Sequence, residues 1–267
     1  MAGASEIVLY SYDAFAGERL GEDAAYPPAG EALDQLLATR SELDSIAETV
    51  RETPARGIAC YRPPFGDPRG EPYAFDYLGM LGLPAAPALD FPSDAPAAAF
   101  AQCSNDGPDF AARFVNYVES GRPALATSRL LDDLGLALGE RPNLVVWDTR
   151  GLRFTDRIKR LPDEKAYDNP ALPRADIWFD RPAGELAALR GPFYQGLGIA
   201  NLGLEELPAR IGVFPLGERR LALFNYNTGI VRLGSLPGRR LWAAPLAEGA
   251  PGDPALLAGG AAALFEF

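Results

Sequence analysis

Short apolar runs alternate with longer amphipathic segments along the first two thirds of the chain. The runs are rich in β-branched, aromatic and small residues, which is typical of buried strands. We expect strands at residues 7–15, 57–61, 83–91, 97–102, 123–127, 144–147 and 177–179. Apolar residues at three- and four-residue steps predict helices at residues 31–53, 73–80, 108–119, 128–138 and 185–197. This alternation favours a mostly parallel sheet covered on both faces, that is, a doubly wound α/β domain.

The pattern changes beyond Pro208, where short apolar runs are separated by Gly, Pro and Asn turns with no helix between them. Strands are expected at residues 211–214, 220–226, 230–233, 240–243 and 262–267. We therefore predict two domains. Residues 1–205 form the α/β domain, in which residues 1–54 supply an N-terminal strand and an acidic helix, and residues 206–267 form a small antiparallel β domain.

Composition narrows the class of protein. The chain has 267 residues, of which 48% are hydrophobic and 23% charged, as in an ordinary globular protein. Its net charge of −11 disfavours nucleic acid as a partner, because binding to phosphates depends on clustered Lys and Arg. No apolar run reaches the roughly 18 residues of a membrane span. Residues 1–6 carry neither a basic patch nor an apolar signal region, so we expect a cytoplasmic protein.

The chain contains no histidine, which excludes Ser-His-Asp and Cys-His triads and histidine-ligated zinc or haem. Any catalysis would depend on carboxylates, Lys, Tyr or backbone groups. The two cysteines, Cys60 and Cys103, have no metal-ligand spacing and are expected to be free, buried thiols. No phosphate-binding glycine motif is present either. We therefore expect no cofactor, no metal and no catalytic residue.

Ligands of doubly wound sheets bind at the carboxyl ends of the strands, so residues there are the candidates for chemistry. Ser128 lies between a predicted strand and a predicted helix, but it lacks the small neighbours and the histidine of a nucleophile elbow. We expect it to cap the helix that follows. Cys60 has Arg62 nearby to favour a thiolate, yet it also lacks a base and is expected to pack in the core.

A glycoside hydrolase without histidine would use a pair of carboxylates, for which Asp13, Glu18, Asp76 and Asp148 are candidates without a distinctive spacing. Aromatic side chains that could stack on a sugar ring are equally typical of a core. As contacts for a sugar or a partner protein we name Tyr12, Asp13, Tyr61, Arg62, Asp76, Trp178 and Tyr194, with Trp242 as a further aromatic candidate.

Three stretches are similar to a known family: GIACYRPPFGDPRGEPYAFDYLGMLGLP, DFPSDAP and FVNYVESGRPALATSRLLDDL. They resemble the class I glutamine amidotransferase-like domain that follows the catalytic barrel in many glycoside hydrolases, best known as the trimerisation domain of bacterial β-galactosidases. The stretch RRLALFNYNTGIVRLGSL, with its Asn-Tyr-Asn turn, and the final AALFEF resemble the small C-terminal β domain of those enzymes. The resemblance covers most of residues 55–267 and implies a flavodoxin-like doubly wound sheet.

The resemblance also implies a loss of catalysis. Domains of this kind lack the Cys and His of true amidotransferases, and this chain has neither a Gly-x-Cys-x-Gly motif nor a histidine. The catalytic barrel that supplies the family's two glutamates is absent, so no catalytic residue can be transferred onto this sequence.

We therefore expect a non-catalytic accessory or oligomerisation module of a carbohydrate-active protein. It would associate with itself as a dimer or trimer, or with a barrel-containing hydrolase, and carbohydrate is a further expected partner. Two alternatives remain open: a stand-alone glycoside hydrolase that uses a carboxylate pair, and a sugar-binding module.

Overall fold

The computed structural model describes residues 56–136, 138–152, 154, 175–234, 236, 238–244 and 253–267, together with Asp44, Glu48, Arg51 and Thr53. The predicted strand at residues 7–15 and most of the predicted helix at residues 31–53 lie outside the described residues. Asp44, Glu48 and Arg51, which fall within that predicted helix, are helical. Residues 56–267 form one compact unit.

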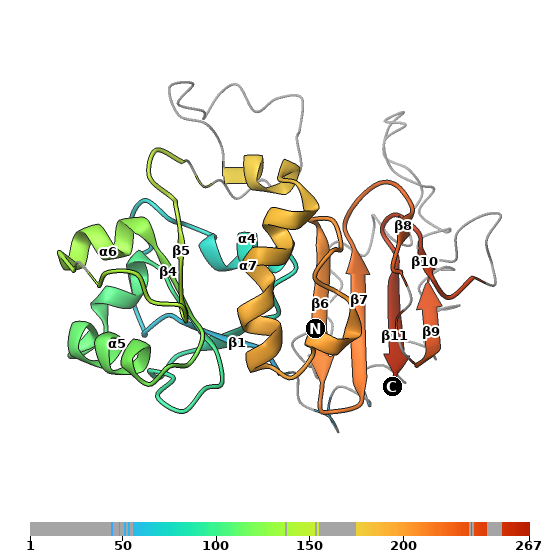
Figure 1. Ribbon diagram of the computed structural model, residues 1–267, viewed down its shortest axis with the longest axis horizontal. Helices are drawn as coiled ribbons and strands as arrows, with labels where there is room; N and C mark the ends of the chain where they lie inside the picture. The colour runs from blue at the N-terminus through green and yellow to red at the C-terminus, as the bar shows by residue number, and fades with distance from the viewer. Residues whose placement is uncertain are drawn as a thin grey trace, which may run out of the picture. The chain divides into compact units, whose positions relative to one another are not determined.

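A five-stranded parallel sheet forms the first part of this unit (Figure 1). Its strands are β1 (Ile58–Tyr61), β2 (Ala85–Ala88), β3 (Ala98–Phe100), β4 (Ala124–Thr127) and β5 (Leu144–Trp147), in the order β2-β1-β3-β4-β5. Every pairing is parallel, which confirms the predicted doubly wound sheet. The chain moves from β1 to β2 on one side and returns to β3 on the other, so the strand order reverses between β1 and β3.

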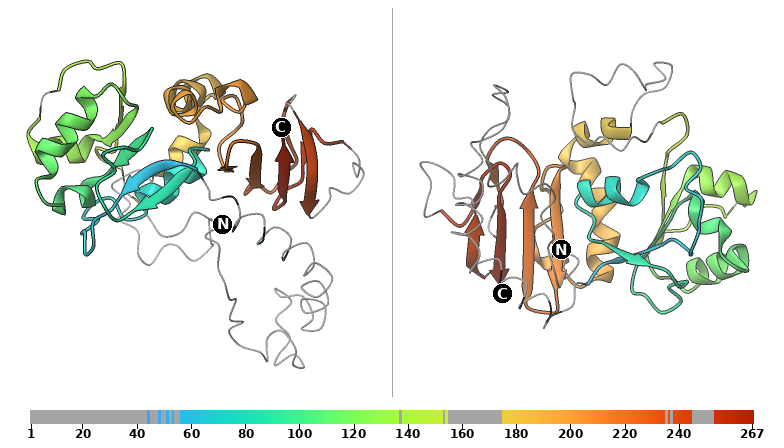
Figure 2. Two further views of the ribbon diagram at one scale, coloured as in Figure 1. Left: turned by 90° about the horizontal axis from the view of Figure 1, so that it is seen from below. Right: turned by 180° about the vertical axis from the view of Figure 1, so that it is seen from behind.

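Helices cover both faces of the sheet (Figures 1 and 2). They are α4 (Ala74–Met80), α5 (Phe110–Glu119), α6 (Ser128–Leu134) and α7 (Ala183–Gly196). Alternate strand residues face opposite sides. Tyr61 and Phe100 pack with α5 and α6 in one apolar cluster, whereas Ile58 and Ala99 pack with α4 and α7 in the other. The continuous apolar strands of the sequence follow from this burial on two sides.

Three short 3₁₀ helices complete the connections: η1 (Gln102–Asp106), η3 (Ala175–Asp180) and η4 (Ala200–Leu202). The strand predicted at residues 177–179 is wrong, because these residues lie in η3. Its aromatic rings pack onto the α/β layer instead of pairing in a sheet: Phe179 stacks on Tyr77 with a centroid distance of 5.5 Å, and Trp178 meets Trp147 at 6.2 Å.

The C-terminal region contains two antiparallel sheets, as the change of pattern predicts (Figure 1). The larger has the order β6-β7-β11-β9, and the smaller pairs β8 with β10. The strands are β6 (Ile211–Leu216), β7 (Arg220–Asn225), β8 (Val231–Arg232), β9 (Arg239–Ala244), β10 (Leu256–Leu257) and β11 (Ala262–Glu266).

One asparagine organises the turn that leaves β7. Asn225 is 1% exposed, and its Nδ2 donates to the carbonyl oxygens of Gly229, Leu257 and Ala258. Its Oδ1 accepts a hydrogen bond from the backbone N–H of Asn227 at 3.0 Å. The side chain therefore replaces backbone pairing where β7 ends and the smaller sheet begins.

The parallel and antiparallel sheets share one apolar core. The cluster that contains Ile58 and Leu125 of the parallel sheet also contains Val213 and Leu223 of the antiparallel sheet, and α7 lies between them (Figure 2). A domain boundary near residue 206 stays a prediction. Among the described residues, no helix combines the length and apolar character needed to cross a membrane.

Candidate ligand-binding site

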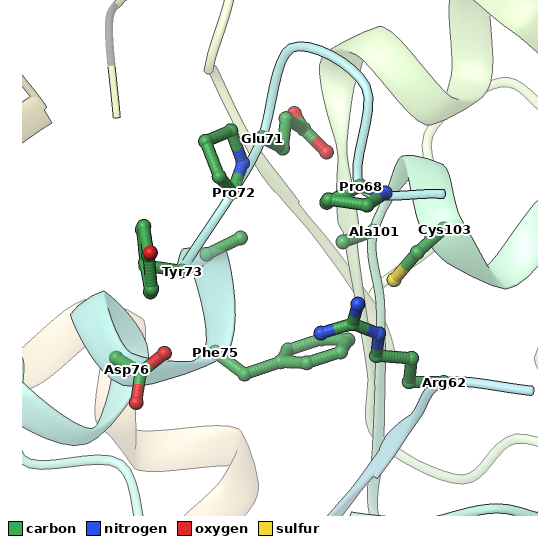
Figure 3. Close-up of a pocket in the computed structure, with 10 residues that line it drawn as sticks. Arg62, Pro68, Glu71, Pro72, Tyr73, Phe75, Asp76, Ala101 and Cys103 are labelled. Carbon is green, nitrogen blue, oxygen red and sulfur yellow. The ribbon is translucent and has the colours of Figure 1, made fainter. Parts of the chain in front are cut away.

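A pocket of about 190 Å³ opens at the carboxyl ends of β1 and β3, where the strand order reverses (Figure 3). Arg62 follows β1, and Cys103 lies in η1 directly after β3. The remaining wall comes from the loop before α4 and from the first turn of that helix, and includes Glu71, Tyr73, Phe75 and Asp76. This is the position at which doubly wound sheets bind their ligands.

The loop between β1 and α4 has an unusual backbone. Phe65, Arg69 and Tyr73 adopt left-handed conformations, with φ of 63°, 49° and 64°. Each such residue costs roughly 1–3 kcal/mol, so the surrounding contacts must hold it in place. Two such contacts are the hydrogen bond from Asp67 N–H to Asp106 Oδ2 at 2.7 Å and the ion pair of Arg69 with Asp106 at 2.6 Å.

Glu71 anchors the same loop in the interior. Its side chain is 2% exposed, and Oε2 accepts hydrogen bonds from the Gln102 backbone N–H at 2.9 Å and from Thr127 Oγ1 at 2.8 Å. Oε1 accepts from Thr149 Oγ1 at 2.5 Å. The carboxylate thus joins the loop to the ends of β3, β4 and β5, and both of its oxygens are engaged.

Ser128 lies next to this carboxylate network and is completely buried. Its Oγ donates to Asp148 Oδ1 at 3.0 Å and accepts from the Thr149 backbone N–H at 2.9 Å. The expectation that Ser128 caps the helix is wrong, because Thr127 is the N-cap residue and accepts from Leu130 N–H at 3.3 Å. Ser128 is the first residue of α6, and its hydroxyl ties α6 to the end of β5.

Both cysteines are free and buried, as expected. Burial raises the pKa of Cys60 to about 12 and the pKa of Cys103 to about 11. Arg62 lowers the pKa of the Cys103 thiol, but by less than burial raises it. Both thiols are therefore protonated at neutral pH, and neither provides a thiolate nucleophile.

Arg62 and Asp76 are the two sequence candidates that the structure brings together at the pocket. In the view of Figure 3, Arg62 and Cys103 lie on one side of the pocket and Tyr73 and Asp76 on the other. The Arg62 guanidinium forms no ion pair or hydrogen bond with any described residue. The hydrogen bond from Arg62 to the Ala88 carbonyl oxygen is donated by the backbone N–H.

The other aromatic candidates lie elsewhere. Tyr61 is 2% exposed and packs against Phe91 and Phe110 in the core. Tyr194 is completely buried and donates to the Gly82 carbonyl oxygen at 2.7 Å, and burial raises its pKa.

Trp178 is partly buried and has the Arg181 guanidinium over its ring, 4.7 Å from the centroid. Asp148 is exposed at the end of β5 and is not part of the pocket wall. Tyr12, Asp13 and Glu18 lie outside the described residues. Trp242 lies in β9 and is partly buried. Among the named candidates that the structure describes, Arg62 and Asp76 line the pocket.

Sequence reasoning missed Glu71, Tyr73 and Phe75. Glu71 lies in a Pro- and Gly-rich loop, where no periodic pattern marks a buried residue. Tyr73 and Phe75 belong to a predicted helix, and the sequence does not show which surface their rings line. The partners of Glu71 could have indicated this edge of the sheet, because Gln102 and Thr149 each lie two residues after the end of an apolar strand. Polar residues at such positions meet at one edge of a parallel sheet.

The strand order and pairing define an α/β domain with a five-stranded parallel sheet, followed by a small antiparallel β region. Neither a scan against protein-family models nor a search of the curated proteins finds a match to this chain. The resemblance to the amidotransferase-like domains of glycoside hydrolases therefore stays a hypothesis based on the sequence stretches quoted above.

Proposed function

We propose that this chain is a non-catalytic accessory module of a carbohydrate-active, glycoside hydrolase-like protein, and that it binds a sugar in the pocket at the carboxyl ends of β1 and β3. The observation that carries the proposal is the composition of this pocket. It combines aromatic rings, one guanidinium and an exposed carboxylate at the point where the strand order reverses, without an activated nucleophile.

The lining of the pocket has the chemistry that a pyranose requires. A sugar ring presents an apolar face of C–H groups and a rim of hydroxyls, which demand aromatic surface and polar partners respectively. Tyr73, 49% exposed, and the partly buried Phe75 offer the rings. Asp76 is exposed at the start of α4 and can accept hydrogen bonds from hydroxyls.

Binding is favoured over hydrolysis by the state of the carboxylates. Glycoside hydrolysis needs two carboxyl groups on either side of the scissile bond, roughly 5–9.5 Å apart. Glu71 also lines the pocket, but three donors occupy its oxygens and its side chain is 2% exposed. Asp76 is then left without a second available carboxylate among the described residues of the pocket wall.

Calorimetric titration with a panel of monosaccharides, together with assays on nitrophenyl glycosides, tests the proposal. We expect binding without turnover. Tyr73→Ala should weaken binding about 2- to 10-fold through the loss of one aromatic contact. Tyr226→Ala removes a similarly exposed tyrosine from the antiparallel region and should leave affinity unchanged. Turnover that disappears in Asp76→Asn would instead establish the hydrolase alternative.

Self-association as a dimer or trimer, or association with a barrel-containing hydrolase, is a second proposal. It is favoured by β5, which is one of the two edge strands of the parallel sheet among the described residues and carries Val146 at 47% exposure. An apolar edge strand can pair with another chain. Light scattering should show an oligomer that Val146→Lys dissociates and Ile230→Lys, at an exposed site between β7 and β8, does not. A monomeric unaltered protein that also binds no barrel-containing hydrolase would refute it.

A further inference from the structure

The proposed sugar-binding pocket contains a cation without a partner among the described residues, and we infer from it that the preferred ligand is an acidic sugar of the hexuronate type. The inference rests on the proposed function, since it names the chemistry of the ligand in that same pocket. Its carboxylate would pair with Arg62, its ring would lie against Tyr73 and Phe75, and its hydroxyls would donate to Asp76.

Arg62 differs from the other arginines at the carboxyl end of the sheet. Arg69 forms ion pairs with Asp106 and Asp133, and Arg150 donates two hydrogen bonds to Asp132, at 2.8 and 2.7 Å.

Arg129 donates to the carbonyl oxygens of Gly70 and Leu152. The Arg62 guanidinium has no such partner among the described residues and lines the pocket. Of these four described arginines, Arg62 lines the pocket and is the one whose guanidinium donors have no described partner.

A guanidinium presents two parallel N–H donors that match a carboxylate in a bidentate arrangement. Arg62 is the only cation among the described residues that line the pocket, and Glu71 and Asp76 contribute carboxyl groups to the same lining. Doubling the charge of a ligand doubles its attraction to one guanidinium and also its repulsion from two carboxylates. A phosphate with nearly two negative charges is therefore disfavoured relative to a carboxylate with one.

The size and lining of the pocket add the sugar ring. Its volume of about 190 Å³ is below the roughly 300–1,000 Å³ of pockets that hold drug-sized ligands, so a single ring fits better than an oligosaccharide. The aromatic rings of Tyr73 and Phe75 provide the apolar contact that a bare carboxylate such as acetate could not use. Asp76 lies opposite Arg62 in Figure 3, so a ligand with a carboxylate at one end and hydroxyls at the other is oriented by both.

The test compares galacturonate and glucuronate with galactose, glucose, acetate and inorganic phosphate by calorimetry on the full chain. We expect each hexuronate to bind about tenfold or more tightly than its neutral parent, which is the contribution of a charge-assisted hydrogen-bond pair. In Arg62→Gln the affinity for the hexuronates should fall until the preference is within about twofold. Arg62→Lys, which keeps the charge and loses the fork, should give an intermediate preference.

Arg232→Gln is the control, because it removes another exposed arginine, which lies in β8. It should leave the preference intact. Equal affinity for acidic and neutral sugars, or phosphate binding tighter than hexuronate binding, would overturn the inference and leave the proposed sugar site standing. If none of the sugars binds, the proposed function fails together with the inference.

Discussion

Glu71 shows how much a single residue can determine at the pocket. It is a buried carboxyl group that forms no ion pair with a described residue, and its two oxygens accept hydrogen bonds from one backbone N–H and two threonine hydroxyls. Burial of a polar group is costly unless such donors surround it. The loop that carries Arg62 and Tyr73 therefore keeps its position as long as Glu71 stays bound to the strand ends.

Glu71→Gln tests this role. The substituted amide places an NH₂ group where donors already converge, so at least one hydrogen bond is lost in a buried site. We expect the free energy of unfolding to fall by about 1–3 kcal/mol in urea titrations. Glu206→Gln, at an exposed position, should change it by less than about 0.5 kcal/mol. Equal stability of the two variants would show that the Glu71 network contributes nothing.

The buried thiols predict a pH dependence. Burial raises the pKa of Cys60 from 9.0 to about 12, so above pH 9 the unfolded chain loses this proton before the folded protein does. The stabilisation is complete below pH 9 and decreases as the pH rises toward 12, because the folded state then binds more protons than the unfolded state. Unfolding titrations of the unaltered protein and Cys60→Ala should differ in slope between pH 9 and 11, with the weaker dependence in the variant. Parallel slopes would contradict the burial of a protonated thiol.

At the scale of elements, one buried arginine of α7 makes several hydrogen bonds to neighbouring segments. Arg190 is completely buried, and its guanidinium donates to the carbonyl oxygens of Leu81, Glu205, Leu207 and Pro208. These carbonyls belong to the turn after α4 and to the segment that leads to β6. A single side chain thus satisfies backbone acceptors in two segments that are far apart in the sequence.

Arg190→Met should therefore loosen the contact between α7 and its neighbours. It fills a similar volume but leaves buried carbonyls without donors, and we expect a loss of about 3–5 kcal/mol in the free energy of unfolding. Hydrogen exchange should increase in residues 204–208. Arg181→Met, which removes an exposed i,i+4 ion pair with Glu185, should cost less than about 1 kcal/mol. A similar cost for both variants would argue against the role assigned to Arg190.

The elements themselves could be predicted where burial is simple. The runs at residues 57–61 and 97–102 contain β1 and β3, which are predictable because their residues are mostly buried on both faces of the sheet. The run at residues 177–179 has too few residues to distinguish a strand from an aromatic turn, and it forms η3. The two-residue β10 carries no detectable period, since only its pairing with β8 defines it.

The site was less accessible to sequence reasoning than the fold. Arg62 and Asp76 could be proposed because they follow a predicted strand and a turn, and the pocket contains both. The burial of Glu71 could not, because a loop carboxylate has no periodic signal, and its partners Gln102, Thr127 and Thr149 lie 31 to 78 residues away along the chain. Contacts of this kind depend on strand order, which a single sequence does not encode locally.

At the scale of the whole molecule, the parallel and antiparallel sheets share one core. Leu125 of β4 and Leu223 of β7 belong to the same buried cluster, and residues 56–267 form one compact unit. A core that spans two sheets ties their stabilities together, because either sheet alone would expose the apolar face that it now buries. The structure thus predicts cooperative unfolding across residue 206.

Leu223→Ala distinguishes one cooperative unit from two independent domains. The side chain is completely buried, so its truncation should cost about 2–5 kcal/mol. In native-state hydrogen exchange on the full chain, the opening free energies of amides in β7 and in β4 should fall by the same amount, although the substitution lies in β7. Leu241→Ala, at an exposed position of β9, should leave both unchanged. Loss of protection in β7 with unaltered protection in β4 would mean that the regions before and after residue 206 unfold independently, despite the core that they share.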